Sequence, residues 1–177
     1  MKGQARAVVI GGGVVGVSTL YHLAKKGWSD VILIERKELT SGSTWHAAGL
    51  LPLFNMSYSV GQVHKYSVNL YENLEKEIGN DIGLRKVGNI RLALNQDRMD
   101  EYHQYAGVAA TIGVKVEFLT PKKVKEIWPL CNIEGLVGAI LHPEDGYIQP
   151  ADVTQAMATG ARKLGAQIHR QHLGYRY

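Results

Sequence analysis

The chain has 177 residues, of which 45% are hydrophobic and 20% are charged, and its formal net charge is +4. This composition is ordinary for a folded globular protein and excludes intrinsic disorder as the main state of the chain. The single cysteine, Cys131, excludes an internal disulfide framework and a cysteine-rich zinc site.

Residues 7–34 carry the pattern of a strand, a helix and a second strand. Residues 7–10 and 31–34 are short apolar runs rich in β-branched residues, which predict buried strands. Between them, residues 14–26 place apolar side chains at helical spacing, and Gly27 is suited to follow the helix C-terminus. Strand, helix and strand within about 30 residues form a βαβ unit. This stretch contains glycines and polar residues, so we expect neither a membrane span nor a signal peptide.

Beyond residue 39 the pattern changes to a mixture of helices and strands. In chain order we expect a loop with a short helix near residues 45–50, a helix over 60–78, a bent strand or strand pair over 84–94, a helix over 97–112, a strand over 114–119, a helix over 122–128, a strand over 136–141, a turn-rich connection over 142–150, a helix over 151–164 and a last strand opening at Ile168. The helix that begins at residue 122 follows Thr120 and Pro121, which are typical of a helix N-terminus.

The basic residues predict no nucleic-acid partner. Lys122, Lys123 and Lys125 form the densest cluster, and they fall on one short predicted helix. A solvated helix face explains them better than a nucleic-acid patch, because no aromatic residues alternate with them along a basic stripe. The histidines outside residue 46 show no metal-ligand spacing, so no metal site is expected.

A glycine-rich turn between the first strand and the first helix indicates a dinucleotide site. Residues 11–16 fit the pattern G-x-G-x-x-G, and an acidic residue follows about 20 positions later at the end of the second strand. The first glycine permits the tight turn, the second lets a pyrophosphate approach the backbone, and the third lets helix and strand pack closely. The candidate residues are Gly11, Gly13, Val14, Val15, Gly16, Glu35 and the neighbouring Arg36. The pattern alone leaves NAD and FAD open, and a turn without a ligand is the alternative.

The segment after Glu35 resembles a known family, and this resemblance favours FAD over NAD. Residues 43–49 read Ser-Thr-Trp-His-Ala-Ala-Gly, and with the glycine turn they resemble the dimethylglycine dehydrogenase and sarcosine dehydrogenase family. These are FAD-dependent enzymes within the larger group similar to D-amino-acid oxidase. Further similar stretches lie at residues 87–93, 128–130 and 142–150. The resemblance extends from about residue 7 to residue 166 and fades beyond residue 169.

The resemblance implies that FAD is bound covalently through His46, whose counterpart in the family is joined to the 8α carbon of the flavin. A neutral imidazole is a competent nucleophile near neutral pH, which agrees with that role. From the sequence alone, a packed or surface histidine would be the simpler interpretation. The other residues that the segment places near the cofactor are Gly42, Ser43, Thr44 and Gly49. A plain helix cap is the alternative for Ser43 and Thr44.

The family implies oxidation of an N-methylated glycine-type amine, dimethylglycine or sarcosine, by hydride transfer to the flavin. The electron acceptor would be an electron-transfer flavoprotein or oxygen. Arg91, Tyr58 and Tyr66 are residue types that suit the carboxylate and the methylamine of such a substrate. The catalytic residues stay unknown. A non-catalytic or regulatory dinucleotide-binding relative and an NAD-dependent dehydrogenase are the alternatives.

These observations predict an α/β fold with α+β character in its second region, namely a Rossmann-like FAD-binding βαβ unit followed by part of a mixed-sheet substrate domain. We expect residues 1–55 to form the FAD-binding segment, residues 56–148 the partial substrate domain, and residues 149–177 a truncated return to the FAD domain. The chain is thus interpreted as an N-terminal fragment of a family enzyme. Its expected location is the cytoplasm, or the mitochondrial matrix if a targeting segment is missing.

Overall fold

The computed structural model describes residues 4–79 and 81–172, so the end of the predicted return segment, residues 173–177, lies outside the described residues. The chain forms two compact units. Unit 1 comprises Met1–Gly49, Tyr71–Leu84 and Ile148–Tyr177, and unit 2 comprises Leu50–Leu70 and Arg85–Tyr147. Residues 71–84 therefore belong to unit 1, whereas the sequence placed them in the predicted substrate domain, residues 56–148.

Unit 1 is built on a parallel sheet with the strand order β1-β2-β9. Its strands are β1 (Ala7–Ile10), β2 (Val31–Ile34) and β9 (Gln167–His169), and Ile34 of the central strand is paired with Ile10 on one side and His169 on the other. Every residue of β2 is buried, which explains why the strand is apolar without alternation. The predicted βαβ unit is confirmed, and so is the strand at Ile168.

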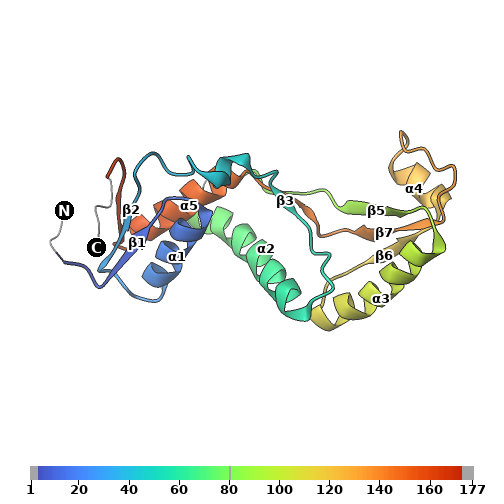
Figure 1. Cartoon of the computed structure of the whole chain (residues 1–177), viewed down its shortest axis with the longest axis horizontal. Helices are drawn as coiled ribbons and strands as arrows, with labels where there is room; N and C mark the ends of the chain where they lie inside the picture. The colour runs from blue at the N-terminus through green and yellow to red at the C-terminus, as the bar shows by residue number, and fades with distance from the viewer. Residues whose placement is uncertain (1–3, 80, 173–177) are drawn as a thin grey trace. The chain divides into compact units, whose positions relative to one another are not determined.

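Two helices pack side by side in unit 1, α1 (Val14–Lys25) and α5 (Pro150–Lys163) (Figure 1). Gly160 makes their close approach possible, because a Cβ there would lie 2.8 Å from Cε2 of Tyr21. The Tyr21 hydroxyl donates a hydrogen bond of 3.0 Å to Glu77, which lies in the last turns of α2 (Tyr58–Ile78). The buried face of α1 and the small residues of α5 thus form the core beside the sheet.

Unit 2 is built on an antiparallel sheet with the strand order β5-β7-β6. The strands are β5 (Asn89–Ala93), β6 (Glu117–Leu119) and the central β7 (Gly138–His142). Helix α3 (Gln96–Ile112) runs along this sheet (Figure 1). Asn95 caps α3 by accepting the Arg98 N–H at 2.9 Å, and Gly113 ends it in the left-handed conformation. The core lies between α3 and the sheet and includes Tyr105 and Ile140.

A short helix and a small second sheet complete unit 2. Helix α4 (Pro121–Ile127) is capped by Thr120, as its sequence predicts. The small sheet has the order β3-β8-β4, formed by β3 (Leu50–Leu51), β8 (Gly146–Tyr147) and β4 (Arg85–Lys86). Both pairings are antiparallel, so the incoming segment at residue 50 and the outgoing segment at residue 147 run beside each other.

Two predicted elements differ from the structure. The short helix expected near residues 45–50 is a 3₁₀ helix, η1 (Ser43–His46), followed by strand β3. Its position is fixed by Thr44, which bonds to the glycine turn far away in sequence. The strand expected over 114–119 is confined to residues 117–119, because the Val114 N–H still bonds the Ala109 carbonyl in the Gly113 turn.

The fold class is α/β, as predicted, with a parallel sheet in unit 1 and antiparallel sheets in unit 2. Among the described residues, no helix is both long and apolar enough to cross a membrane. Within the same residues, no cluster of histidine, cysteine and acidic side chains has the composition of a metal site.

Candidate functional site

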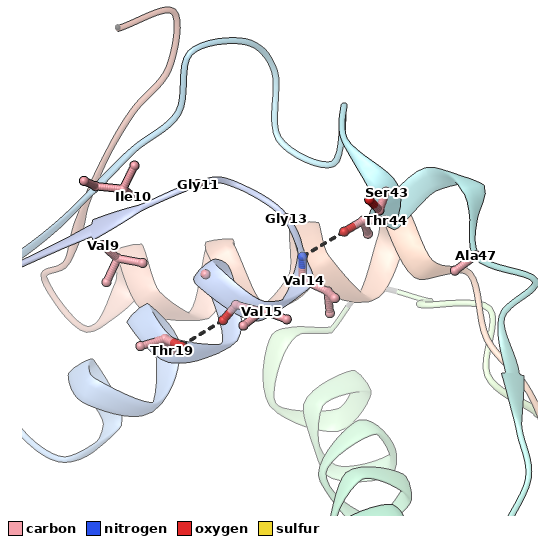
Figure 2. Close-up of a pocket in the computed structure, with 11 residues that line it drawn as sticks. Val9, Ile10, Gly11, Gly13, Val14, Val15, Thr19, Ser43, Thr44 and Ala47 are labelled. Atoms are coloured by element: carbon pink, nitrogen blue, oxygen red, sulfur yellow. Dashed lines mark hydrogen bonds between the residues drawn. The ribbon is translucent and has the colours of Figure 1, made fainter. Parts of the chain in front are cut away.

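The glycine turn opens onto a cavity of about 580 Å³ at the end of β1 and the start of α1 (Figure 2). The turn forms one side of this cavity and η1 contributes another part of its lining. The lining residues are Val9, Ile10, Gly11, Gly13, Val14, Val15, Gly16, Thr19, Ser43, Thr44 and Ala47. The structure thereby brings seven of the twelve predicted cofactor residues to one cavity.

Two glycines of the turn are required by its geometry. Gly11 has φ +108°, a conformation that residues with a side chain rarely adopt. A Cβ at Gly16 would lie 2.0 Å from the Gly11 carbonyl oxygen, so helix α1 can approach the turn only if residue 16 lacks a side chain. At Gly13 the absent side chain keeps the cavity free beside Thr44. The tight turn at Gly11 and the close helix approach at Gly16 agree with two roles that the G-x-G-x-x-G pattern predicts, and the approach of a pyrophosphate at Gly13 stays a prediction.

Glu35 lies at the end of β2, where its carboxylate is held by two backbone groups. Oε2 accepts a hydrogen bond from the Gly12 N–H at 2.6 Å, and Oε1 accepts one from the Lys37 N–H at 2.8 Å. The carboxylate therefore has a fixed orientation next to the glycine turn, and its remaining lone pairs can accept hydrogen bonds from ribose hydroxyls. Arg36 is exposed and, like Glu35, does not line the cavity.

The segment that carries η1 is attached to the glycine turn at two points. The Thr40 N–H donates to the Gly12 carbonyl at 2.9 Å, and the Val14 N–H donates to Thr44 Oγ1 at 2.9 Å (Figure 2). Thr40 is buried with φ +71°, an uncommon conformation for a β-branched residue. The segment is thus held in place even though it has little regular structure.

His46 is the last residue of η1, and it lies in the chain between two cavity residues, Thr44 and Ala47. Its side chain is exposed, and its ring centroid is 3.8 Å from that of Trp45. Gly42 precedes η1 and has open space where a Cβ would point. Gly49 has φ +73° and lies against Ile148, whose N–H bonds the Gly49 carbonyl at 2.8 Å.

These residues fit an FAD molecule. A Cβ at residue 16 would drive α1 away from the turn, and the cavity beside Gly13 is open. Backbone at the start of a helix stabilises phosphate charge, and a fixed carboxylate at the end of β2 suits a ribose. The structure does not bring Arg36, Gly42, His46 or Gly49 into the cavity lining, so their roles as cofactor residues stay predictions.

Unit 2 contains a buried polar cluster that the sequence patterns did not predict. Tyr105, His142 and Asp145 are each at most 1% exposed. Asp145 Oδ1 accepts the Leu53 N–H at 2.9 Å, and the Tyr105 hydroxyl donates to the Leu53 carbonyl at 3.2 Å. Among the described residues, Asp145 Oδ2 and both ring nitrogens of His142 have no hydrogen-bond partner. Buried polar atoms of this kind are uncommon in folded proteins.

Burial sets the protonation of this cluster. It raises the pKa of Asp145 to about 6, against the opposing effects of the Leu53 N–H and the Arg91 guanidinium. Burial also lowers the pKa of His142 to about 4, with a smaller contribution from Arg91. The pKa of Tyr105 rises to about 12, mainly through burial and secondly through the Asp145 carboxylate. At neutral pH, His142 is therefore neutral and Asp145 is mostly ionised.

Of the three residue types considered for a substrate, only Arg91 belongs to this region. Its guanidinium lies over the Phe54 ring, 4.2 Å from the centroid, and the Phe54 and Tyr105 rings are 4.2 Å apart. Tyr58 and Tyr66 are exposed on α2. The sequence signal for this cluster is limited to His142 and Asp145, which flank a Pro-Glu pair. A turn between two strands explains this pattern equally well, because proline and aspartate are common in turns.

Comparison with known proteins places the chain in a family. The family model described as "FAD dependent oxidoreductase" matches residues 6–173. Dimethylglycine dehydrogenase of Rattus norvegicus is 44% identical over 94% of this chain and 20% of its own length. The regulatory subunit of pyruvate dehydrogenase phosphatase of Mus musculus is 40% identical over 96% of this chain and 19% of its own length.

Among solved structures, L-proline dehydrogenase from P. horikoshii superposes with a TM-score of 0.89 at 29% identity, over 97% of this chain and 45% of the other. The chain spans about a fifth of the length of the curated relatives it matches. The family match covers almost all of the chain and selects FAD over the NAD alternative. The chain therefore belongs to the family of FAD-dependent oxidoreductases, and the predicted resemblance to dimethylglycine dehydrogenase is confirmed.

Proposed function

We propose that this chain is the flavin-binding N-terminal part of an enzyme that oxidises an N-methylated glycine-type amine, dimethylglycine or sarcosine. The observation that carries the proposal is the cavity in which the glycine turn and η1 meet, together with the family match over residues 6–173. The 44% identity with dimethylglycine dehydrogenase supports the substrate class. In this proposal, unit 1 binds FAD and unit 2 contributes part of the substrate domain.

The residues of the cavity have distinct tasks in this proposal. When bound, FAD supplies a two-electron oxidation of the carbon next to the amine nitrogen. Gly11 and Gly16 allow the tight turn and the close approach of α1, Gly13 lets the diphosphate approach the backbone, and the Glu35 carboxylate accepts hydrogen bonds from the ribose. The start of α1 contributes positive electrostatic potential beside the phosphate charge. Val9 and Ile10 of β1 line the same cavity, and in this proposal another part of the cofactor lies against them.

His46 is the proposed covalent anchor. It forms a bond from a ring nitrogen to the 8α methyl carbon of the flavin. The imidazole and the methyl group each release a proton, and the electron pair left on the flavin is taken up by dioxygen as the oxidant. The tether prevents loss of the cofactor. Exposure of the His46 side chain next to the cavity residue Ala47 supports this role, because the ring is accessible to a bound ligand.

Replacement of His46 by alanine is expected to abolish covalent flavin. We would incubate the purified chain with FAD, denature it in acid, separate it on a denaturing gel and measure flavin fluorescence at its mass. The wild type should give a fluorescent band and His46→Ala none. His103→Ala is the matched control, because His103 lies in unit 2 against Phe118 and should leave the band unchanged. A dark wild-type band with FAD in the supernatant would contradict the covalent bond and retain reversible binding.

A second candidate function follows from one comparison. The chain is 40% identical to a protein named as a regulatory subunit, so a non-catalytic dinucleotide-binding role is the alternative. The two functions differ in what happens on adding dimethylglycine or sarcosine to the flavin-loaded protein extended to full family length. Bleaching of the visible absorbance of the flavin would favour the enzyme, because the substrate would have reduced the cofactor. An unchanged spectrum with both amines would favour the regulatory role.

The electron acceptor, the cellular location and the interpretation as a fragment are also proposals. The electron acceptor is an electron-transfer flavoprotein or oxygen, and the location is the cytoplasm or the mitochondrial matrix. The rat relative is named as mitochondrial, which supports the second location. Reading the coding sequence beyond residue 177 in all frames tests the fragment interpretation, because family-like residues there would support it.

A further inference from the structure

The link between η1 and the glycine turn is made by one side chain. Thr44 Oγ1 accepts a hydrogen bond of 2.9 Å from the N–H of Val14, the first residue of α1, thirty positions earlier in the chain. Gly13, the N-cap of α1, has no side chain to fill that role. Thr44 therefore caps a helix to which it does not belong.

Thr44 is buried and packs against the glycine turn. Its side chain is buried, although its neighbours in η1, including Trp45 and His46, are exposed. A Cβ at Gly13 would lie 3.1 Å from Thr44 Oγ1, so the hydroxyl packs directly against the glycine turn. In Figure 2 the Thr44 side chain points toward Val14, and a dashed line marks its bond with the Val14 nitrogen. Of the described residues in η1, Thr44 alone is buried.

The fold of η1 depends on this attachment. Four residues of 3₁₀ helix have no independent stability, and the bond at the C-terminal end of η1 runs from the Ala47 N–H to the Thr44 carbonyl at 3.2 Å. Thr44 is thus both the anchored residue and the acceptor that closes the turn containing His46. Loss of the Oγ1 bond would remove the side-chain link between this turn and the α1 terminus, and leave η1 held by its packing against α5 and by the Thr40 bond to Gly12.

We infer that Thr44 is a positioning residue that holds His46 for covalent attachment of the flavin. The inference rests on the proposed role of His46 as the anchor. Thr44 itself forms no bond with the flavin in this role. It fixes the turn so that His46 stays between the cavity residues Thr44 and Ala47, and orientation of a nucleophile toward a bound partner accelerates bond formation. The acceptor function can be kept by serine and removed by valine, which has nearly the same shape.

The test compares Thr44→Val, Thr44→Ser and Thr111→Val with the wild type. Thr111 is exposed on α3 in unit 2, and its hydroxyl donates to the Val108 carbonyl of its own helix, so Thr111→Val makes the same change of side chain outside the cavity. We expect Thr44→Val to slow covalent incorporation of FAD at least tenfold while the Kd for reversible binding changes less than threefold. Thr44→Ser and Thr111→Val should stay within threefold of the wild type in both measurements.

A second measurement separates this inference from the proposed function. Hydrogen exchange of the Ala47 amide reports whether the turn around His46 is closed, and it requires no flavin. We expect exchange at least tenfold faster in Thr44→Val and unchanged in Thr44→Ser and Thr111→Val. Fast exchange in Thr44→Val with no covalent flavin in the wild type would refute the anchor but keep the positioning of the turn. Wild-type exchange in Thr44→Val, or equal loss of reversible binding and attachment, would overturn the inference.

Discussion

Replacement of Gly16 by alanine is expected to abolish FAD binding and to destabilise unit 1 by about 3 kcal/mol, the upper end of the usual cost of overpacking. The added Cβ would lie 2.0 Å from the Gly11 carbonyl oxygen. That carbonyl has little freedom to move, because the Gly11 N–H bonds the Ile34 carbonyl at 2.9 Å and β1 is paired with β2 along its length. Helix α1 would have to shift, and the glycine turn would change shape with it.

The measurement is thermal unfolding followed by circular dichroism, together with a fluorescence titration with FAD. Gly107→Ala is the matched control, because residue 107 lies within α3 and its Cβ would meet no atom within 4 Å. That control should bind FAD as the wild type does and be stabilised by up to about 1 kcal/mol through helix propensity. Wild-type affinity and melting in Gly16→Ala would show that α1 does not approach the turn as closely as described.

The second large effect concerns the pH dependence of unit 2. The folded pKa of Asp145, about 6, lies above its ordinary value of 3.8, so Asp145 contributes stability that is complete below pH 3.8 and is lost as the pH rises through about 6. The folded pKa of His142, about 4, lies below its ordinary value of 6.5, so His142 contributes stability that is complete above pH 6.5 and is lost as the pH falls through about 4. At about 1.4 kcal/mol per pKa unit, each contribution amounts to about 3 kcal/mol.

These contributions oppose each other between pH 4 and pH 6.5, and single variants should separate them. In Asp145→Asn the free energy of unfolding should fall relative to the wild type by about 3 kcal/mol as the pH goes from 6.5 to 4, and in His142→Gln it should rise by about the same amount. Asparagine keeps an oxygen for the Leu53 N–H bond, so the folded geometry is retained. Arg91, Glu144 and His64 also affect the Asp145 carboxyl.

Denaturant unfolding at several pH values gives these differences directly. Trp128 is the only tryptophan in unit 2, so a background of Trp28→Phe and Trp45→Phe makes its fluorescence specific for that unit. Differences from the wild type cancel the titration of all unchanged groups. Parallel pH profiles of Asp145→Asn and the wild type would mean that Asp145 is not titrating in a buried site.

The sequence predicted the elements of unit 1 because their signals are local. The apolar runs of β1 and β2 and the spacing of the glycines each lie within a few residues, and the structure confirms them. The position of Glu35 directly after β2 also followed from a known separation in this motif, but its bond with the Gly12 N–H did not. By contrast, η1 was misplaced because the Thr44 bond to Val14 joins residues that no periodicity connects.

The buried cluster of unit 2 could not be predicted for a related reason. Tyr105, His142 and Asp145 come from α3, β7 and a turn, and each is a single polar residue in a stretch that other patterns explain. They meet only because β7 is the central strand of its sheet and the incoming chain at Leu53 passes over them. Strand order depends on long-range packing, which a single sequence does not show.

Each unit is assembled from separated stretches of the chain, and this affects the order in which the two units are completed during synthesis. Strand β9 and helix α5, which complete the sheet and core of unit 1, are translated after the whole of unit 2. Unit 2 can therefore close on the ribosome while β1, α1 and β2 still lack their final partners. Until then the apolar faces of β2 and α1 stay uncovered. The unit that contains the glycine turn and its cavity, although its first residues are translated early, is therefore completed after unit 2.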